Sequence, residues 1–116
     1  MARYEVNDAA VARARRLIDA GTVDTTTEWS EAAPSAAEEN DLIEKDGYDA
    51  FGRWHLAIDP KASEETKGRY GFPYGDLATV YRAALIHAKQ RATQNDHDAI
   101  VRAADDLLQR LDEREG

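Results

Sequence analysis

The sequence contains no cysteine among its 116 residues. This absence excludes a disulfide framework, a thiolate zinc site and a cysteine nucleophile. The sequence also lacks any run approaching the roughly 20 apolar residues of a membrane-spanning helix, and its opening residues lack the apolar core of a secretory signal peptide. These absences predict a soluble protein of the cytoplasm, without a membrane span.

Motifs for metal binding and catalysis are missing as well. The three histidines, His55, His87 and His97, show no metal-ligand spacing, either among themselves or with carboxylates. None of the three serines lies in a nucleophile elbow. The sequence therefore predicts no metal and no cofactor, and it favours a protein that is not an enzyme.

Positive charge is scarce, since 15 lysines and arginines face 23 carboxylates and the net charge is −8. A protein that binds nucleic acid directly needs a basic surface, so this balance argues against that function. The charge is unevenly distributed: residues 34–49 carry six carboxylates and one lysine, and residues 96–116 carry seven carboxylates and three arginines. Residues 61–95, the basic segment, hold six cations and three carboxylates. Acidic flanks of this kind are typical of a solvated surface.

The length suits one domain spanning residues 1–116, and a chain of this size can bury enough surface for a core without cross-links. Apolar residues recur mostly at helical spacing. We therefore predict a mainly α fold of four or five helices, with an antiparallel helical hairpin at the C-terminal end and at most one short two-stranded β pairing.

Two helices are indicated in the N-terminal half. Asn7 is a favourable N-cap for the first, and Gly21 suits the left-handed position at its end. Ser35 begins the pattern of a capping box at the start of the second, which is expected to stop at Gly47 and to be followed by one short turn. Between the two helices, residues 22–34 contain three successive threonines and a closing proline, which predict a loop.

Residues 54–59 alternate large apolar side chains with smaller or polar ones, which is the period of a β-strand. A strand needs a partner, and residues 3–6 or 69–74 could supply one; an extended crossing segment is the other interpretation. Ser63 is a favourable cap for a short helix. Glycines and a proline then predict that residues 70–76 are irregular.

The last two helices have the most regular pattern. The first is expected to run from a cap at Asp76 to about Gln94, with Asn95 in a left-handed exit. The second is capped by Asp96 and carries an apolar stripe formed by Ile100, Ala103, Ala104, Leu107, Leu108 and Leu111. The short connection predicts an antiparallel hairpin. Ile86 faces away from the main stripe, so we expect it to contact a second layer of N-terminal segments or a second subunit.

Four stretches follow one another from Trp54 onward: WHLAID, EETKGRYGFPYGD, AALIHAKQRA and AADDLLQRLD. With them, and with VARARRLIDAG and Trp29 nearer the N-terminus, the chain resembles a group of short uncharacterised bacterial and archaeal proteins over nearly its whole length. The resemblance implies a compact, free-standing domain. The group has no established activity, so the resemblance assigns no catalytic residue.

A loop rich in tyrosine and glycine is the strongest candidate for a binding site. Residues 67–76 combine aromatic rings, glycine amides and two cations, and such a loop is costly to order unless it packs or binds. On the following helix, Arg82 and Lys89 share one face, whereas His87 and Arg91 share the opposite flank. The ligand-binding residues predicted from this pattern are Lys67, Arg69, Tyr70, Tyr74, Arg82 and Lys89. The other interpretation is that the tyrosines seal the helical hairpin and the cations pair with acidic neighbours.

These patterns favour a non-enzymatic binding or interaction module, which uses the Tyr70–Asp76 loop and the adjacent basic helix face to bind a protein or a small anionic ligand. A second interpretation is a small enzyme with a pocket at His55, Tyr74 and Asp76. A third is an acidic protein that mimics nucleic acid, with carboxylates in rows at phosphate-like spacing. The sequence leaves the oligomeric state open.

Overall fold

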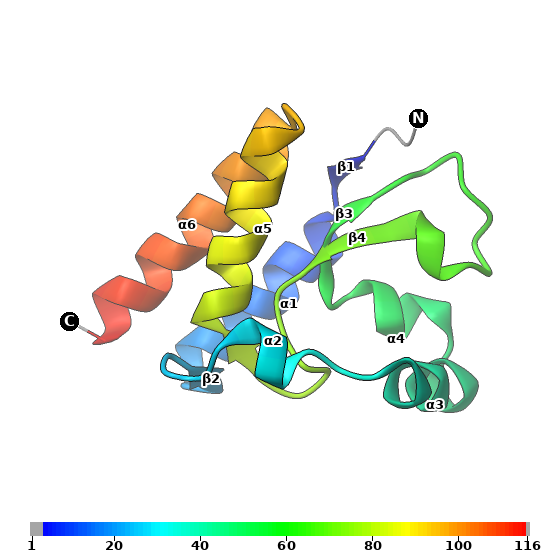
Figure 1. Cartoon of the computed structure of the whole chain (residues 1–116), viewed down its shortest axis with the longest axis horizontal. Coiled ribbons are helices and arrows are strands. Elements are labelled where there is room, and N and C mark those ends of the chain that lie inside the picture. Colours follow the sequence, from blue (N-terminus) through cyan, green and yellow to red (C-terminus); the bar gives the residue numbers. More distant parts are fainter. Residues whose placement is uncertain (1–3, 116) are drawn as a thin grey trace.

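The computed structural model describes residues 4–115, and this range forms six α-helices, one 3₁₀-helix and five short strands (Figure 1). The helices are α1 (Asp8–Asp19), α2 (Trp29–Ala32), α3 (Ala36–Asp46), α4 (Tyr48–Gly52), η1 (Lys67–Arg69), α5 (Arg82–Gln94) and α6 (Asp98–Glu115). The strands are β1 (Glu5–Val6), β2 (Val23–Asp24), β3 (His55–Ile58), β4 (Tyr70–Pro73) and β5 (Val80–Tyr81). The mainly α fold is confirmed, but the prediction of four or five helices and at most one strand pairing is wrong, because these strands join in two small sheets. Across the described range, every helix is too short or too polar to cross a membrane.

Asn7 precedes α1 as predicted, but its side chain does not cap the helix. The residue is buried, and its Nδ2 donates to the carbonyl oxygens of Gly52 (2.9 Å) and His55 (3.2 Å). Asn7 thereby ties the start of α1 to the end of α4 and the start of β3. At the other end of α1, Gly21 has φ +80°, which confirms the predicted left-handed position.

The second predicted helix is confirmed as α3. The Ser35 hydroxyl accepts a hydrogen bond from the Glu38 N–H (3.1 Å), and the Glu38 carboxylate accepts one from the Ser35 N–H (3.0 Å), which completes the capping box. α3 ends before Gly47 (φ +88°), and the short turn expected after it is α4. The predicted loop at residues 22–34 is wrong in part. It contains α2 and also β2, because β2 pairs in parallel with β5.

The predicted strand at residues 54–59 is β3, the central strand of an antiparallel sheet whose order within the described chain is β1-β3-β4. Both predicted partners pair with it, residues 3–6 through β1 and residues 69–74 through β4; residue 3 lies outside the described range. In the register, Glu5 lies opposite Ile58 and Gly71 lies opposite Ala57. The expectation of an irregular Tyr70–Asp76 segment is therefore wrong for its first part, where pairing with β3 satisfies the backbone groups.

Ser63 does not begin a helix. Its hydroxyl accepts a hydrogen bond from the Glu65 N–H (3.3 Å), which closes a single turn. The 3₁₀-helix η1 follows, and the Thr66 hydroxyl caps it by accepting a hydrogen bond from the Gly68 N–H (3.3 Å). The predicted short helix at Ser63 is therefore wrong, and the chain instead turns there and leads into β4.

Asp76 does not cap a helix either, since α5 begins only at Arg82. The Asp76 carboxylate accepts hydrogen bonds from the N–H groups of Ala78 (3.1 Å) and Thr79 (2.8 Å) and from the Tyr81 hydroxyl (2.9 Å). These contacts close a tight turn whose second residue has φ +74°, outside the right-handed helical region. The chain then forms β5 before it enters α5. The predicted helix start is wrong because the aspartate builds a turn with the same chemistry that would have capped a helix.

α5 and α6 form the predicted antiparallel hairpin, drawn in yellow and orange to red in Figure 1. The turn between them differs from the prediction: Asn95 has φ −107°, and Asp96 takes the left-handed position with φ +59°. α6 begins at Asp98, so Asp96 is not at its N-cap position. The predicted apolar stripe of α6 is buried at Ile100, Ala104, Leu107, Leu108 and Leu111, and half-buried at Ala103.

The core lies where α1, the hairpin and the sheet meet, since α1 contacts both α6 and β3. Its largest fully buried side chains are Tyr74, Ile18, Leu56, Leu85, Ile100, Leu107, Leu111 and Val80. Ile86 of α5 is half-buried and lies beside Leu108 of α6 rather than beneath an N-terminal layer. Figure 1 shows the hairpin at one end of the molecule and α3 with α4 at the other. Between these two ends, α5 of the hairpin contacts β4 of the sheet, and this contact borders the pocket described below.

Candidate functional site

The two cations of the predicted binding loop are held by other parts of the chain. Lys67 Nζ lies 3.3 Å from Glu39 Oε1 on α3. The Arg69 guanidinium donates to the carbonyl oxygen of Ala62 (2.7 Å) and, at longer distances, to the carbonyl oxygens of residues 59–60. Both side chains therefore hold the loop that precedes β4 in place.

The two cations predicted on the helix also have partners. Arg82 makes two hydrogen bonds to Asp112 (Nε–Oδ1 2.8 Å, Nη2–Oδ2 3.1 Å), and Lys89 Nζ lies 2.7 Å from Asp105 Oδ1. The hydrogen bond raises the pKa of Arg82 and lowers the pKa of Asp112. Both pairs connect α5 to α6 across the hairpin, as the ion-pair interpretation expects.

The two tyrosines predicted as ligand contacts are buried. The Tyr74 hydroxyl donates to the carbonyl oxygen of Arg53 (2.6 Å), and burial raises its pKa. The Tyr70 ring packs against Phe51 (ring centroids 6.1 Å apart) and against Gly52, where any added side chain would overlap it. None of the three pockets described in this section is lined by more than one of the six predicted ligand residues. The structure places these six side chains in packing contacts and separate ion pairs.

The three residues of the enzyme interpretation, His55, Tyr74 and Asp76, have separate partners as well. Burial lowers the pKa of His55 to about 4, against the opposing effect of the hydrogen bond between its Nδ1 and the Phe51 carbonyl oxygen (2.9 Å). The His55 ring packs on Phe51 and Tyr70, with centroid distances of 4.4 and 6.2 Å, and the residue is 6% exposed. The Asp76 carboxylate accepts its hydrogen bonds from the groups of its own turn, the Ala78 and Thr79 N–H groups and the Tyr81 hydroxyl. These three side chains line none of the pockets described in this section together.

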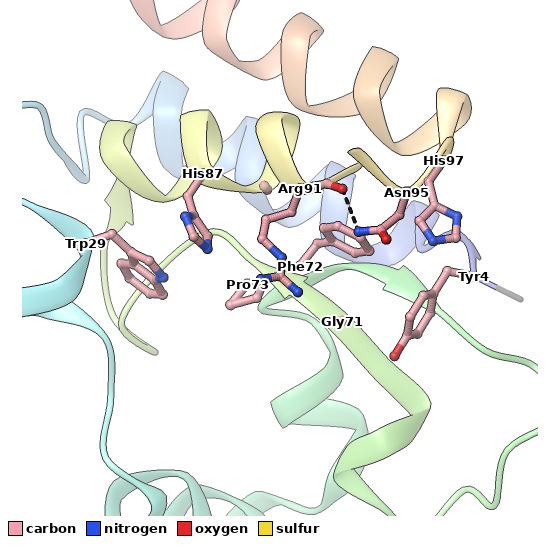
Figure 2. Close-up of a pocket in the computed structure, with 10 residues that line it drawn as sticks. Tyr4, Trp29, Gly71, Phe72, Pro73, His87, Arg91, Asn95 and His97 are labelled. Atoms are coloured by element: carbon pink, nitrogen blue, oxygen red, sulfur yellow. Dashed lines mark hydrogen bonds between the residues drawn. The ribbon is translucent and has the colours of Figure 1, made fainter. Parts of the chain in front are cut away.

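A pocket of about 560 Å³ lies between β4 and α5 (Figure 2). The segment 71–73 of β4 forms one wall, and one face of α5 forms the other. Figure 2 shows Trp29 of α2 at one end and Tyr4 with His97 at the opposite end. The lining residues are Tyr4, Trp29, Gly71, Phe72, Pro73, His87, Ala88, Arg91, Asn95 and His97. The predicted loop and helix therefore border a pocket, but they do so with other side chains than those predicted.

Three rings form one end of this pocket. Tyr4, Phe72 and His97 meet edge to face, with centroid distances of 5.8 Å between Tyr4 and Phe72, 5.7 Å between Phe72 and His97, and 5.9 Å between Tyr4 and His97. Phe72 has φ +61°, a left-handed conformation that costs about 1–2 kcal/mol for a residue with a Cβ. Such strain is characteristic of ligand-binding positions. At Phe72 it accompanies a half-buried ring that lines the pocket and packs against the edge of the core.

The polar groups of the pocket are cationic or neutral. Arg91 has no carboxylate of a described residue within ion-pair distance, and its guanidinium reaches toward Pro73 (Figure 2). The Arg91 carbonyl oxygen accepts a hydrogen bond from Asn95 Nδ2 (2.9 Å), and His87 lies one turn earlier on the same flank of α5. The lining contains no aspartate or glutamate among the described residues, in a chain whose net charge is −8. The pocket thus offers cationic and amide donors without a competing carboxylate.

The sequence contains only part of the information needed to find this pocket. It places His87 and Arg91 on one helix flank and Phe72 in the aromatic loop, but it does not show which flank faces that loop. Tyr4 reaches the pocket because β1 pairs with β3, and Trp29 because α2 packs on α5. The helical spacing of His87 and Arg91 is the one available signal, and it becomes informative once β4 is known to contact α5.

Two further pockets are present. One of about 670 Å³ lies on the outer side of α5, next to Ile86 and Leu108, and one of about 170 Å³ lies near the start of α1. The described residues contain no group of three or more histidines, aspartates or glutamates that could hold a metal ion. The pocket between β4 and α5 is distinguished from the other two by combining several aromatic side chains, Tyr4, Trp29 and Phe72, with an arginine.

Comparison with known proteins leaves the chain without an assigned family. No protein-family model, curated protein or solved structure matches it. The resemblance to uncharacterised bacterial and archaeal proteins therefore stays a prediction, and the pocket is the feature of the chain that points to a function.

Proposed function

We propose that this protein is a non-enzymatic binding module whose pocket between β4 and α5 takes a small ligand with an aromatic ring and an anionic group. The observation that carries the proposal is the combination of aromatic walls with Arg91, which has no ion-pair partner among the described residues, in a lining without described carboxylates. The proposal keeps the predicted loop and helix as binding elements. It replaces the predicted side chains by those that face the pocket.

The lining supplies two kinds of interaction that one small molecule can use together. Trp29, Phe72 and Tyr4 offer ring faces and edges, and an aromatic ligand gains from stacked or edge-to-face contacts of this kind. The Arg91 guanidinium can donate two parallel hydrogen bonds to a carboxylate or phosphate. His87 and Asn95 lie on the same wall as additional polar groups. A molecule with both parts fits the pocket better than either part alone.

The same lining favours binding over catalysis. Its described residues include the histidines His87 and His97 but no serine, lysine, aspartate or glutamate, so a histidine base would have no carboxylate to orient it and no serine or lysine nucleophile to activate. The mimicry interpretation receives less support, because several of the carboxylates it needs are already paired with cations: Glu39, Asp105 and Asp112. Their negative charge is therefore partly neutralised on the surface.

The test compares phenyl phosphate, inorganic phosphate and phenol at matched ionic strength, with the melting temperature as the readout. A ligand that binds the native state stabilises it by RT ln(1 + [L]/Kd), which is about 1.4 kcal/mol at ten times Kd. Phenyl phosphate is expected to raise the melting temperature more than either of the other two. Trp29 fluorescence should change in the same titration, whereas Trp54, which is 3% exposed, should not respond.

Two arginines of α5 provide a matched pair of variants. Arg91→Gln removes the charge in the pocket, and the lost charged hydrogen bonds should weaken phenyl phosphate binding roughly ten- to a hundredfold. Arg82→Gln removes a guanidinium on the other side of the same helix, where it is paired with Asp112, and should leave binding unchanged. The proposal is wrong if Arg91→Gln binds as the wild type does, or if inorganic phosphate stabilises as strongly as phenyl phosphate.

A further inference from the structure

The outer side of the hairpin carries a regular pattern that the pocket does not use. On α5, Arg82, Ile86, Lys89 and Thr93 follow one another at spacings of four, three and four residues, and on α6 the same spacings relate Val101, Asp105, Leu108 and Asp112. These two rows, here called the outer seam, lie beside each other along the hairpin. A groove of about 670 Å³ follows the seam on the α5 side, lined by Ile86, Lys89, Gln90, Thr93, Gln94 and Leu108.

The outer seam consists of layers, and its two charged layers have the same arrangement of cation and anion. Arg82 pairs with Asp112 at one end, and Lys89 pairs with Asp105 further along, so the cation is on α5 and the anion on α6 in both layers. Ile86 and Leu108 form the apolar layer between them. The paired side chains keep 38–50% of their surface exposed, so each has room for a second partner.

We propose that the outer seam is the interface of a homodimer, in which a second copy of this chain covers the groove with its own seam. A two-fold axis parallel to the helices would place α5 of one copy over α6 of the other at the same height. Each Arg82 would then face Asp112 of the other chain, each Lys89 would face Asp105, and the Ile86 side chains would share one apolar layer. The charge pattern of the seam is complementary to itself under this one rotation.

The other face-to-face rotation is disfavoured by the same charges. An axis perpendicular to the helices would lay α5 over α5 in reverse and would bring Arg82 close to Lys89 of the second copy. It would bring Asp112 close to Asp105 on the other helix in the same way, and like charges at such contacts cost free energy. Both rotations make every neighbouring pair of helices antiparallel, as in an up-down four-helix bundle, so the charges decide between them. The dimer leaves the pocket open, because His87 and Arg91 lie on the opposite flank of α5.

Sedimentation equilibrium from micromolar to millimolar concentration tests the association. The mass is expected to rise from 12.9 kDa for one chain to twice that value. Ile86→Glu places a charge in the apolar layer and should keep the protein at the single-chain mass, with unchanged helical circular dichroism. Arg102→Glu, an exposed position of α6 outside the seam, changes the net charge more and should leave association intact. A wild type that stays a single chain up to millimolar concentration would overturn the proposal and leave the groove to another partner.

Charge reversal tests the geometry. Arg82→Asp and Asp112→Arg each place like charges in one layer, so each variant alone should remain a single chain. Each loses only one exposed ion pair of its own, so it should stay folded. Mixed together, the two variants should form a heterodimer, because the carboxylates of one chain then face the guanidiniums of the other. If the wild type dimerises but the mixture does not, the seam is not the interface that we propose.

Discussion

The helical hairpin and the segment Tyr70–Tyr81 that leads into it are held together in different ways. In the hairpin, apolar side chains recur every three or four residues along both helices and pack against one another. In Tyr70–Tyr81, polar groups bond to distant parts of the chain, as when the Tyr74 N–H donates to the Trp54 carbonyl oxygen and the Val80 N–H to that of Thr22 (3.1 Å each). The hairpin should therefore be most sensitive to lost volume, and the region around β3 and β4 to changes in hydrogen bonding and protonation.

The largest effect is expected in the hairpin, from Leu107→Ala. Leu107 is 1% exposed in the core cluster, so the shortened side chain leaves a cavity among α1, α5 and α6. The free energy of unfolding should fall by about 2–5 kcal/mol. Chemical denaturation monitored by circular dichroism measures this loss. Gln109→Ala, an exposed change on the same helix, is the control and should stay within about 0.5 kcal/mol of the wild type.

In the sheet, the buried His55 makes stability depend on pH. Burial holds its pKa at about 4 in the native state, below the ordinary value of 6.5. Above pH 6.5 the imidazole is neutral in both the native and the unfolded state, so His55 does not change the free energy of unfolding there. As the pH falls below 6.5, the unfolded chain binds a proton that the native chain does not, so the free energy of unfolding decreases by about 2 kcal/mol near pH 5. Denaturant titrations between pH 7.5 and pH 5 measure this slope.

His55→Gln identifies the source of the slope. Glutamine does not titrate but retains an N–H donor for the Phe51 carbonyl oxygen. The variant should show a flatter dependence of stability on pH over the same range. The carboxylates of Asp19 and Asp112 have lowered pKa values, and their contribution is lost only as the pH falls below the ordinary value of 3.8. An unchanged slope in His55→Gln would mean that His55 is not the group that titrates.

The contrast between the two regions also explains what the sequence predicts. The hairpin, the capping box at Ser35 and the exit at Gly21 follow from residues within a few positions of one another, and all three are confirmed. The strand at residues 54–59 is confirmed as well, because its alternation is local. Asp76 does not cap a helix, because an aspartate accepts hydrogen bonds from the following backbone N–H groups equally well in a turn. The choice between turn and helix depends on the pairing of β5 with β2, a strand far away in the sequence.

The candidate site likewise depends on contacts between residues far apart in the sequence, which the sequence alone does not predict. Arg82 and Arg91 are chemically identical and lie on one helix, and the sequence favours Arg82 because it shares a face with Lys89. The structure differs from this expectation because Asp112 lies across the hairpin from Arg82, 30 residues later, while β4 approaches the flank of Arg91. Which cation faces a carboxylate and which faces a pocket is decided by tertiary packing. A helical pattern alone does not contain that information.

The smallest effect is expected at Asp76, where the two regions join. Asp76→Ala removes the acceptor for the Ala78 and Thr79 N–H groups and should lower the free energy of unfolding by about 1 kcal/mol. Because α5 begins at Arg82, the helical circular dichroism of the folded variant should equal that of the wild type. A clear loss of helical signal under native conditions would show instead that Asp76 caps a longer helix.

The Tyr81 hydroxyl gives a second, independent measurement of the same turn. It donates to Asp76 Oδ2 (2.9 Å), and this hydrogen bond raises the pKa of Tyr81 above its ordinary value because the ionised phenol would lose the contact and face a carboxylate. Asp76→Asn keeps an acceptor for the turn but removes the negative charge. In an alkaline absorbance titration, one tyrosine should therefore ionise at lower pH in Asp76→Asn and in Asp76→Ala than in the wild type. Only Asp76→Ala should also lose stability at neutral pH, since the asparagine oxygen can still accept from the backbone. If neither variant shifts a tyrosine, the contact between Asp76 and Tyr81 does not form in solution, and the turn must be held by its backbone alone.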